Sequence, residues 1–396
     1  MTTKWPSSCL YAVSSINIHR QTAARIACGR NVTLVRFYAQ QQQHRKLSDS
    51  QSQPDVAKQY DALKSAPARI VNRAQDDPIN PPLTTVPPPL NVPQEQGSDN
   101  FFAYWFKVGR AYGTFYKEGL KAVWSNRKAA KMLRERLVED VKAQGTMTST
   151  ADTLRKNMIP DGGSDTILSA VAQKAITRSE YQLLERYRYD VGKLPLFGVL
   201  VLIFGEWLPL LVPFIPGAVP GTCRIPKQVQ GMRQKAEERR RVSFRQGIAE
   251  PTKEQLAVSE TDSESMGGTV WPLARPQYAQ TLLRRLRDDQ LLHLSSTLGV
   301  HNRLWDRLQL PPPSALLRRG LAKKLQYITT DDILLLQCGG VSKLVSDEVM
   351  VAAEERGLDV LGRKDAALRE QLAWWLNRQQ EDGGRGRAVI DMLFRR

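Results

Sequence analysis

The longest continuous hydrophobic stretch of the chain covers residues 194–219, in which Glu206 is the only ionisable side chain. Its 26 residues exceed the roughly 20 that an α-helix needs to cross the hydrocarbon core of a bilayer. Pro209 and Pro213 remove backbone donors, so we expect a regular helix only over about 196–207. The pattern predicts a membrane span; a re-entrant hairpin and a hairpin buried in the protein core are the alternatives.

Helical periodicity begins abruptly at residue 101, and eight aromatic residues fall within the next sixteen positions. Basic residues interrupt these rings, so the segment is not predicted to span a membrane. A helix at a membrane interface or against a partner helix fits the pattern, and an aromatic-rich core helix fits it equally well. Further helices are predicted over about 117–141 and 167–190, the second containing a capping box at 177–180.

In the last third of the chain, apolar residues at spacings of four, four and three predict one long helical face: Leu317, Leu321, Leu325 and Ile328. Basic side chains occupy its opposite face and flanks: Arg318, Arg319, Lys323 and Lys324. Leucines at helical spacing predict an earlier helix over about 277–298. Short helices are expected over about 331–336, 346–356 and 366–377, followed by a frayed tail from residue 379.

The charge balance changes this picture. The chain has 57 Lys and Arg against 40 Asp and Glu, a formal net charge of +17, and its first acidic residue is Asp49. An excess of this size favours an anionic membrane, a nucleic-acid or ribosome partner, or a targeting peptide. A leading segment rich in Arg, Ser and Thr and free of acids is typical of a mitochondrial transit peptide. A disordered basic tail of a cytosolic or nuclear protein is the alternative.

The run from Arg36 to Ala39 resembles a processing site, in which an arginine precedes an aromatic and then a small residue. Cleavage between Tyr38 and Ala39 would lower the net charge to +12. The predicted organisation is a transit peptide at 1–38, a disordered proline-rich linker at 39–100, pre-membrane helices at 101–193, the transmembrane segment at 194–219, a basic juxtamembrane helix at 220–246, a flexible linker at 247–268, a helical domain at 269–378 and a tail at 379–396.

Residues suited to catalysis or metal binding are sparse. The four cysteines, at positions 9, 28, 223 and 338, show no metal-ligand spacing, and the four histidines form no metal-binding motif. The sequence shows no nucleophile with a base and no phosphate-binding loop. We therefore do not expect an enzyme, and we expect no metal, cofactor or small-molecule substrate.

Several short motifs occur in order between 101 and 378: Tyr116-Lys117-Glu118-Gly119-Leu120, Thr177-Arg178-Ser179-Glu180, Glu206 three residues before Pro209, Asp331-Asp332, Gly339-Gly340-Val341, Glu354-Glu355-Arg356-Gly357-Leu358 and Trp375-Leu376. Together they resemble the LETM family, the leucine-zipper and EF-hand-containing transmembrane proteins of mitochondria. The resemblance implies a mainly α, single-pass inner-membrane protein, whose C-terminal domain lies in the matrix and is similar to 14-3-3 folds. No calcium-binding loop of the EF-hand type is present, so calcium sensing is not implied.

The same resemblance implies binding to the mitochondrial ribosome and potassium or other cation/proton homeostasis. The predicted ribosome contacts are Arg318, Arg319, Lys323 and Lys324; a solvated face or contacts to inner-membrane lipids such as cardiolipin are the alternatives. Glu206, beside carbonyls freed by Pro209 and Pro213, is a candidate ion or proton site in a homo-oligomer, or a protonated carboxyl at a helix–helix contact. A purely structural role in membrane organisation or complex assembly is the third hypothesis.

Overall fold

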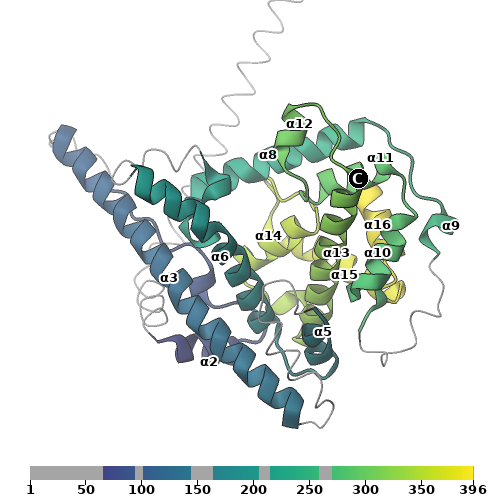
Figure 1. Ribbon diagram of the computed structural model, residues 1–396, viewed down its shortest axis with the longest axis horizontal. Coiled ribbons are helices and arrows are strands. Elements are labelled where there is room, and N and C mark those ends of the chain that lie inside the picture. The colour runs from purple at the N-terminus through teal and green to yellow at the C-terminus, as the bar shows by residue number, and fades with distance from the viewer. Residues whose placement is uncertain (1–65, 94–100, 144–163, 205–214, 258–269, 396) are drawn as a thin grey trace, which may run out of the picture. The chain divides into compact units, whose positions relative to one another are not determined.

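The computed structural model describes residues 66–93, 101–143, 164–204, 215–257 and 270–395. These residues belong to one compact unit, Tyr60–Arg396, whereas a second unit, Met1–Gln59, lies outside the described residues. The described residues form helices and no strand, which confirms the mainly α class (Figure 1). In chain order the α-helices are α2 (Pro67–Asp76), α3 (Phe101–Ala143), α5 (Ser164–Ala172), α6 (Arg178–Phe204), α8 (Pro226–Arg245), α9 (Lys253–Leu256), α10 (Pro276–Arg284), α11 (Asp288–Thr297), α12 (Arg303–Arg307), α13 (Ser314–Gln337), α14 (Ser346–Glu355), α15 (Asp365–Glu381) and α16 (Arg387–Phe394). Short 3-10 helices lie between them: η1 (Leu83–Thr85), η4 (Pro216–Ala218), η5 (Gly221–Cys223), η7 (Pro272–Ala274) and η8 (Val341–Lys343).

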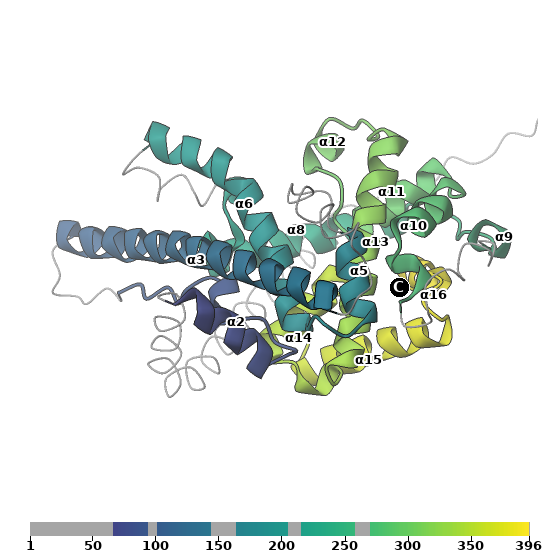
Figure 2. The same ribbon diagram turned by 60° about the horizontal axis from the view of Figure 1, so that its bottom comes forward.

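Helix α3 is one continuous helix of 43 residues, where the sequence predicted an aromatic helix followed by a charged one. Its inward face is buried and consists largely of small and apolar side chains: Phe115, Ala122, Val123, Ala129, Ala130 and Leu133. Together with the buried Gly119, Asn126 and Leu137 they recur at steps of three or four positions, so they form one stripe along the helix. The stripe packs against α2 and α6, and α3 and α6 lie side by side (Figure 2).

The single helix predicted over 167–190 is instead two helices, because the chain turns between α5 and α6. Lys174 has a φ of 55° in this turn, a conformation that would interrupt a right-handed helix. The predicted capping box is confirmed, and it lies at the start of α6. The backbone N–H of Thr177 donates to Glu180 Oε2 at 3.0 Å, and the N–H of Glu180 donates to Thr177 Oγ1 at 3.3 Å.

The predicted leucine stripe is confirmed as the buried face of α13, formed by Leu317, Leu321, Leu325 and Ile328. A separate helix over 331–336 is wrong, because α13 continues without a break to Gln337. It passes through two adjacent buried aspartates whose charges are compensated by arginines from other helices. The earlier helix expected over 277–298 is divided into α10 and α11, which both pack against α13.

The frayed tail expected over 379–396 is also a wrong prediction. Helix α15 continues to Glu381, and α16 then returns to the core, where Val389 and Ile390 are fully buried. The intervening turn contains Gly384, at a φ of 66°. A Cβ at this position would lie 2.2 Å from the Cβ of Trp271, so the turn requires glycine.

The disordered linker expected over 39–100 is corrected in its described part. Ile70 and Ala74 of α2 are fully buried, and α2 packs along α3. Asn80 then bonds to the loop before α14: its Oδ1 accepts from Val345 N at 2.9 Å, and its Nδ2 donates to Lys343 O at 3.1 Å. The prolines of this stretch restrict its backbone in the unfolded chain as well. Less conformational entropy is therefore lost on folding, when a few hydrogen bonds fix the segment.

Candidate membrane-contact site

A buried ion pair holds the start of α6 to the C-terminal helices. Arg178 donates from Nε to Oδ1 of Asp331 on α13 at 2.8 Å, and neither side chain is exposed. Arg178 Nη1 also donates to the carbonyl of Ile79 at 2.8 Å, and Gln182 Nε2 donates to Asp331 Oδ1 at 2.7 Å. Burial alone would raise the pKa of Asp331, but the guanidinium groups of Arg178 and Arg356 hold that pKa well below its usual value.

The neighbouring carboxylate, Asp332, extends this group to two more helices. Arg356, directly after α14, donates from Nη2 to Asp331 Oδ2 at 2.8 Å and from Nε to Asp332 Oδ1 at 2.8 Å. Trp375 and Gln379 of α15 donate to Asp332 Oδ2 at 3.0 and 2.7 Å. Each oxygen of the two aspartates therefore accepts a hydrogen bond from the protein. A network satisfied in this way makes the packing rigid.

The second half of α6 leaves this core and becomes apolar and exposed. Phe197 is buried against Phe115 and Tyr116 of α3. The other faces present large apolar side chains to the surroundings: Leu196, Val199, Val201, Leu202 and Ile203. The exposed fraction of Leu202 is 86% and that of Ile203 is 66%. We call residues 194–204 the apolar arm; a group of exposed apolar residues of this kind marks a contact surface for a membrane or a partner.

Basic and aromatic side chains of α3 accompany the apolar arm. The two helices run antiparallel: Arg136, near the end of α3, pairs with Glu180 at the start of α6 at 2.8 Å, whereas Phe115, nearer the start of α3, shares a small core with Phe197 in the second half of α6. The first turns of α3 therefore lie toward the end of the arm. There Phe106 is 74% exposed, and the adjacent Lys107 and nearby Arg110 are exposed as well. An apolar surface with a basic and aromatic border is suited to the headgroup region of an anionic bilayer.

Asp190 closes the base of the apolar arm. Its Oδ1 accepts a hydrogen bond from Gly221 N at 2.6 Å, which ties α6 to η5 after the chain returns. Beside it, the Arg224 guanidinium lies 5.1 Å from the ring centroid of Tyr189 and donates to the tyrosine hydroxyl. Burial raises the pKa of Asp190 to about 6, although bonds from Gly221 and the charge of Arg224 act in the opposite direction.

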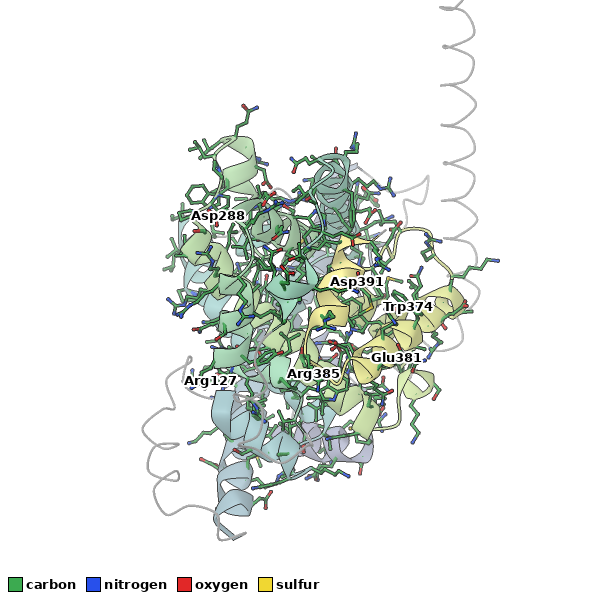
Figure 3. The ribbon with its side chains drawn as sticks, turned by 90° about the vertical axis from the view of Figure 1, so that its right-hand side faces the viewer. Arg127, Asp288, Trp374, Glu381, Arg385 and Asp391 are labelled. Carbon is green, nitrogen blue, oxygen red and sulfur yellow. The ribbon has the colours of Figure 1, made fainter. Side chains whose placement is uncertain are left out.

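The four basic residues predicted to contact a ribosome lie in different environments on α13. Arg319 and Lys323 are exposed. Arg318 is half-buried and donates to Asp288 at 3.1 Å (Asp288 is labelled in Figure 3). The ammonium of Lys324 lies 4.7 Å from the centroid of a tyrosine ring on the same helix, and burial lowers its pKa. Two of the four predicted residues are therefore exposed, and the other two are partly buried and have partners within the fold.

The remaining predicted site residues lie outside the described residues. These are the candidate ion or proton site, Glu206, Pro209 and Pro213, and the candidate cleavage pair, Tyr38 and Ala39. The predicted span over 194–219 is described only at its two ends. Within the described ranges, no helix combines the length and the apolar character that crossing a bilayer requires.

A comparison with known protein families matches residues 99–266 to PNT1, the pentamidine resistance factor domain. The matched region is less than half of the chain; it includes the apolar arm and ends before α10. The PNT1 family is associated with mitochondria. No curated protein and no solved structure matches the chain.

This match overturns the resemblance to the LETM family, because the region that carried the predicted span is similar to a different family. Ribosome binding and cation/proton homeostasis were implied only by that resemblance and are therefore no longer supported. The same holds for the matrix orientation and for the likeness to 14-3-3 folds. The short motifs have a structural explanation. Arg178, Asp331, Arg356 and Trp375 are members of one buried network, and such a network specifies a packing arrangement rather than an activity.

The sequence did not reveal the residues that position the apolar arm as a group. Arg178 and Asp331 stood in separate motifs, and their types are those usually found at the surface. Asp190 was missed as well. The one available signal was its place, an acid four residues before the continuous apolar stretch that begins at residue 194.

Proposed function

We propose that this protein is a membrane-attached helical protein of mitochondria, and that the apolar arm inserts into an anionic membrane. One observation carries the proposal: Leu202 and Ile203 are exposed near the end of a helix whose start is fixed in a buried ion network. Single exposed apolar residues are ordinary, but five on one stretch of helix form a patch. The arm cannot turn inward to cover this patch while the network and Asp190 hold α6.

Charge around the apolar arm supports an anionic lipid as the partner. Lys107 and Arg110 are exposed on the first turns of α3, and Lys193 and Arg224 lie at the base of the arm over the ring of Tyr189. A basic residue close to an anionic membrane contributes about 1 kcal/mol of binding free energy. We propose the inner membrane and its cardiolipin, since the acid-free N-terminal segment is typical of an imported protein.

We further propose that the protein acts by attachment and assembly and is not an enzyme. The most deeply buried charged residues, Arg178, Asp331, Asp332 and Arg356, bond to one another and to backbone or amide groups. Their hydrogen-bonding capacity is used within the fold, so they are structural. The name of the matched domain refers to drug resistance and to no reaction.

Liposome flotation of the full-length protein tests this proposal. We expect the protein to float with vesicles of phosphatidylcholine and cardiolipin and to float less with phosphatidylcholine alone. The double variant Leu202→Ser, Ile203→Ser should no longer float with either kind of vesicle. The control is the double variant Val345→Ser, Trp374→Ser, which changes exposed apolar residues just before α14 and on α15 and should float as the wild type does. Undiminished flotation of the arm variant would disprove insertion. If the arm variant still floats but its copies no longer crosslink to one another as wild-type copies do, the arm is instead a contact in a homo-oligomer.

A further inference from the structure

A second apolar surface lies far from the arm in the sequence, on α12, the segment that follows it and the first turn of α13. Four leucines there have exposed fractions between 55% and 64%: Leu304, Leu308, Leu310 and Leu316. They fall within thirteen residues, in a stretch from α12 to the first turn of α13 that we call the leucine loop (residues 303–316). Leucine at this exposure and density is not explained by a solvated loop, because such loops are usually polar.

The backbone of the leucine loop is ordered, so these side chains are held outward. Leu308 N bonds to Leu304 O at 3.0 Å, and Leu310 N bonds to Trp305 O at 3.2 Å. Between them, Gln309 adopts a φ of 53°, which reverses the chain. Three prolines, at 311 to 313, then lead into α13 and restrict the backbone further.

The charges around the leucine loop favour an anionic partner. Arg307 and Arg319 are exposed beside the leucines, and Arg303 is partly exposed. The one acidic residue of the loop, Asp306, is already paired: Arg239 Nη2 lies 2.8 Å from its Oδ2, and His301 Nε2 lies 3.0 Å from its Oδ1. The loop therefore presents leucine and arginine with its only carboxylate compensated.

Helix α8 joins the leucine loop to the base of the apolar arm. Arg224, just before α8, contacts Tyr189 of α6, whereas Arg239 of the same helix contacts Asp306 and the carbonyl of His301. Between these contacts, the helical part from Pro226 to Arg239 spans about 20 Å. Figure 1 shows α8 running from α6 toward α12. The exposed side chains of α8 include basic and apolar residues, Lys227, Lys235, Arg241, Val242 and Arg245, beside two glutamines and one acid, Glu238.

We propose that the leucine loop is a second membrane-docking point, which inserts its leucines at the headgroup level of the anionic membrane that takes the apolar arm. The inference rests on the proposed function and extends it, because attachment at two points would lay α8 along the membrane surface. Interfacial docking needs apolar side chains that enter the bilayer and basic ones that meet its headgroups, and the loop provides both.

Binding of the full-length protein to cardiolipin-containing vesicles, measured by titration, tests the inference. The variant Leu304→Ser, Leu308→Ser, Leu310→Ser, Leu316→Ser should bind about tenfold or more weakly, since each leucine loses apolar contact with the bilayer. Val345→Ser with Trp374→Ser is the matched control and should bind as the wild type does. The fluorescence emission of an environment-sensitive dye attached to the Leu308→Cys variant should shift to the blue on binding, because position 308 enters a less polar medium. Wild-type protein labelled in the same way gives the background from the native cysteines.

The outcomes separate the two proposals. If the leucine-loop variant binds like the wild type and the dye does not shift, while Leu202→Ser with Ile203→Ser abolishes binding, the arm attaches the protein and the loop inference is wrong. The loop would then be a surface for a protein partner. If neither variant weakens binding, the proposed function itself fails. A circular dichroism spectrum and unfolding midpoint equal to those of the wild type confirm that the loop variant is folded.

Discussion

Arg178 and Asp331 are separated by 153 residues in the sequence and form a buried, two-bond ion pair, with Nε to Oδ1 at 2.8 Å and Nη2 to Oδ2 at 3.4 Å. Arg178 lies inside the region similar to the pentamidine resistance factor domain, and Asp331 lies beyond it. The matched region and the C-terminal helices therefore share one interior. A fragment ending near residue 266 would leave the Arg178 guanidinium without its carboxylate, and a buried charge without a partner is strongly unfavourable.

Asp331→Asn should lower the free energy of unfolding by about 3–5 kcal/mol, because the buried Arg178 guanidinium loses its two-bond carboxylate partner and keeps only Glu348, at 3.9 Å. Chemical denaturation followed by circular dichroism measures this. The control is Asp288→Asn, which breaks the largely exposed pair with Arg318 and should cost about 1 kcal/mol or less. Equal effects of the two substitutions would show that the buried network does not stabilise the fold as argued.

Phe197 and Leu202 lie on the same helix and should respond in opposite ways. Phe197→Ala removes a ring that is 1% exposed and should cost about 3–5 kcal/mol of unfolding free energy. Leu202→Ser changes a side chain that is mostly in solvent and should alter stability by less than about 0.5 kcal/mol, while weakening vesicle binding. Denaturation and flotation of both variants check the pair. A large loss of stability in Leu202→Ser would mean that the arm packs against the protein.

Asp190 should make stability depend on pH between its ordinary pKa of 3.8 and its folded-state pKa of about 6. The folded protein holds this proton more tightly than the unfolded chain does, so the group's contribution is greatest below the lower value. That contribution falls as the pH rises through the upper value. Asp190→Asn has no charge to bury and keeps an acceptor oxygen for Gly221 N. Relative to the wild type, it should gain up to about 3 kcal/mol between about pH 4 and pH 7. Urea unfolding at both pH values measures this, and a difference that does not vary with pH would contradict it.

The N-terminal segment should act only in targeting. Removal of residues 1–38 should prevent import into isolated mitochondria, and the imported full-length chain should begin at Ala39, which N-terminal sequencing or mass spectrometry can establish. Liposome flotation of the shortened protein should match that of the full-length chain, because the apolar arm and the leucine loop are intact. Import of the shortened protein at the normal rate would show that the address lies elsewhere.

The sequence was sufficient for the elements whose burial follows from local periodicity. Leu317, Leu321, Leu325 and Ile328 recur at helical spacing, and this alone predicts that they share a face that must be covered. The capping box at Thr177 and Glu180 was equally readable, since both hydrogen bonds are made within one turn. The break between α5 and α6 was not predicted, because no Gly or Pro marks the turn at Lys174 and the capping box was placed inside a longer helix.

Only the tertiary structure decided where charge is buried and which apolar residues stay exposed. Asp331 and Asp332 look like surface residues in the sequence, and they are buried because arginines from α6 and from the end of α14 reach them across 153 and 24 to 25 residues. Likewise, Phe197 and Leu202 belong to one apolar stretch, but α3 covers the first and leaves the second open. Hydrophobicity is a property of the residue, whereas burial depends on which distant helix lies against it. The apolar face of α13 was therefore predictable from the sequence, whereas α2, α16 and the contact surfaces were not, because they depend on packing against distant helices.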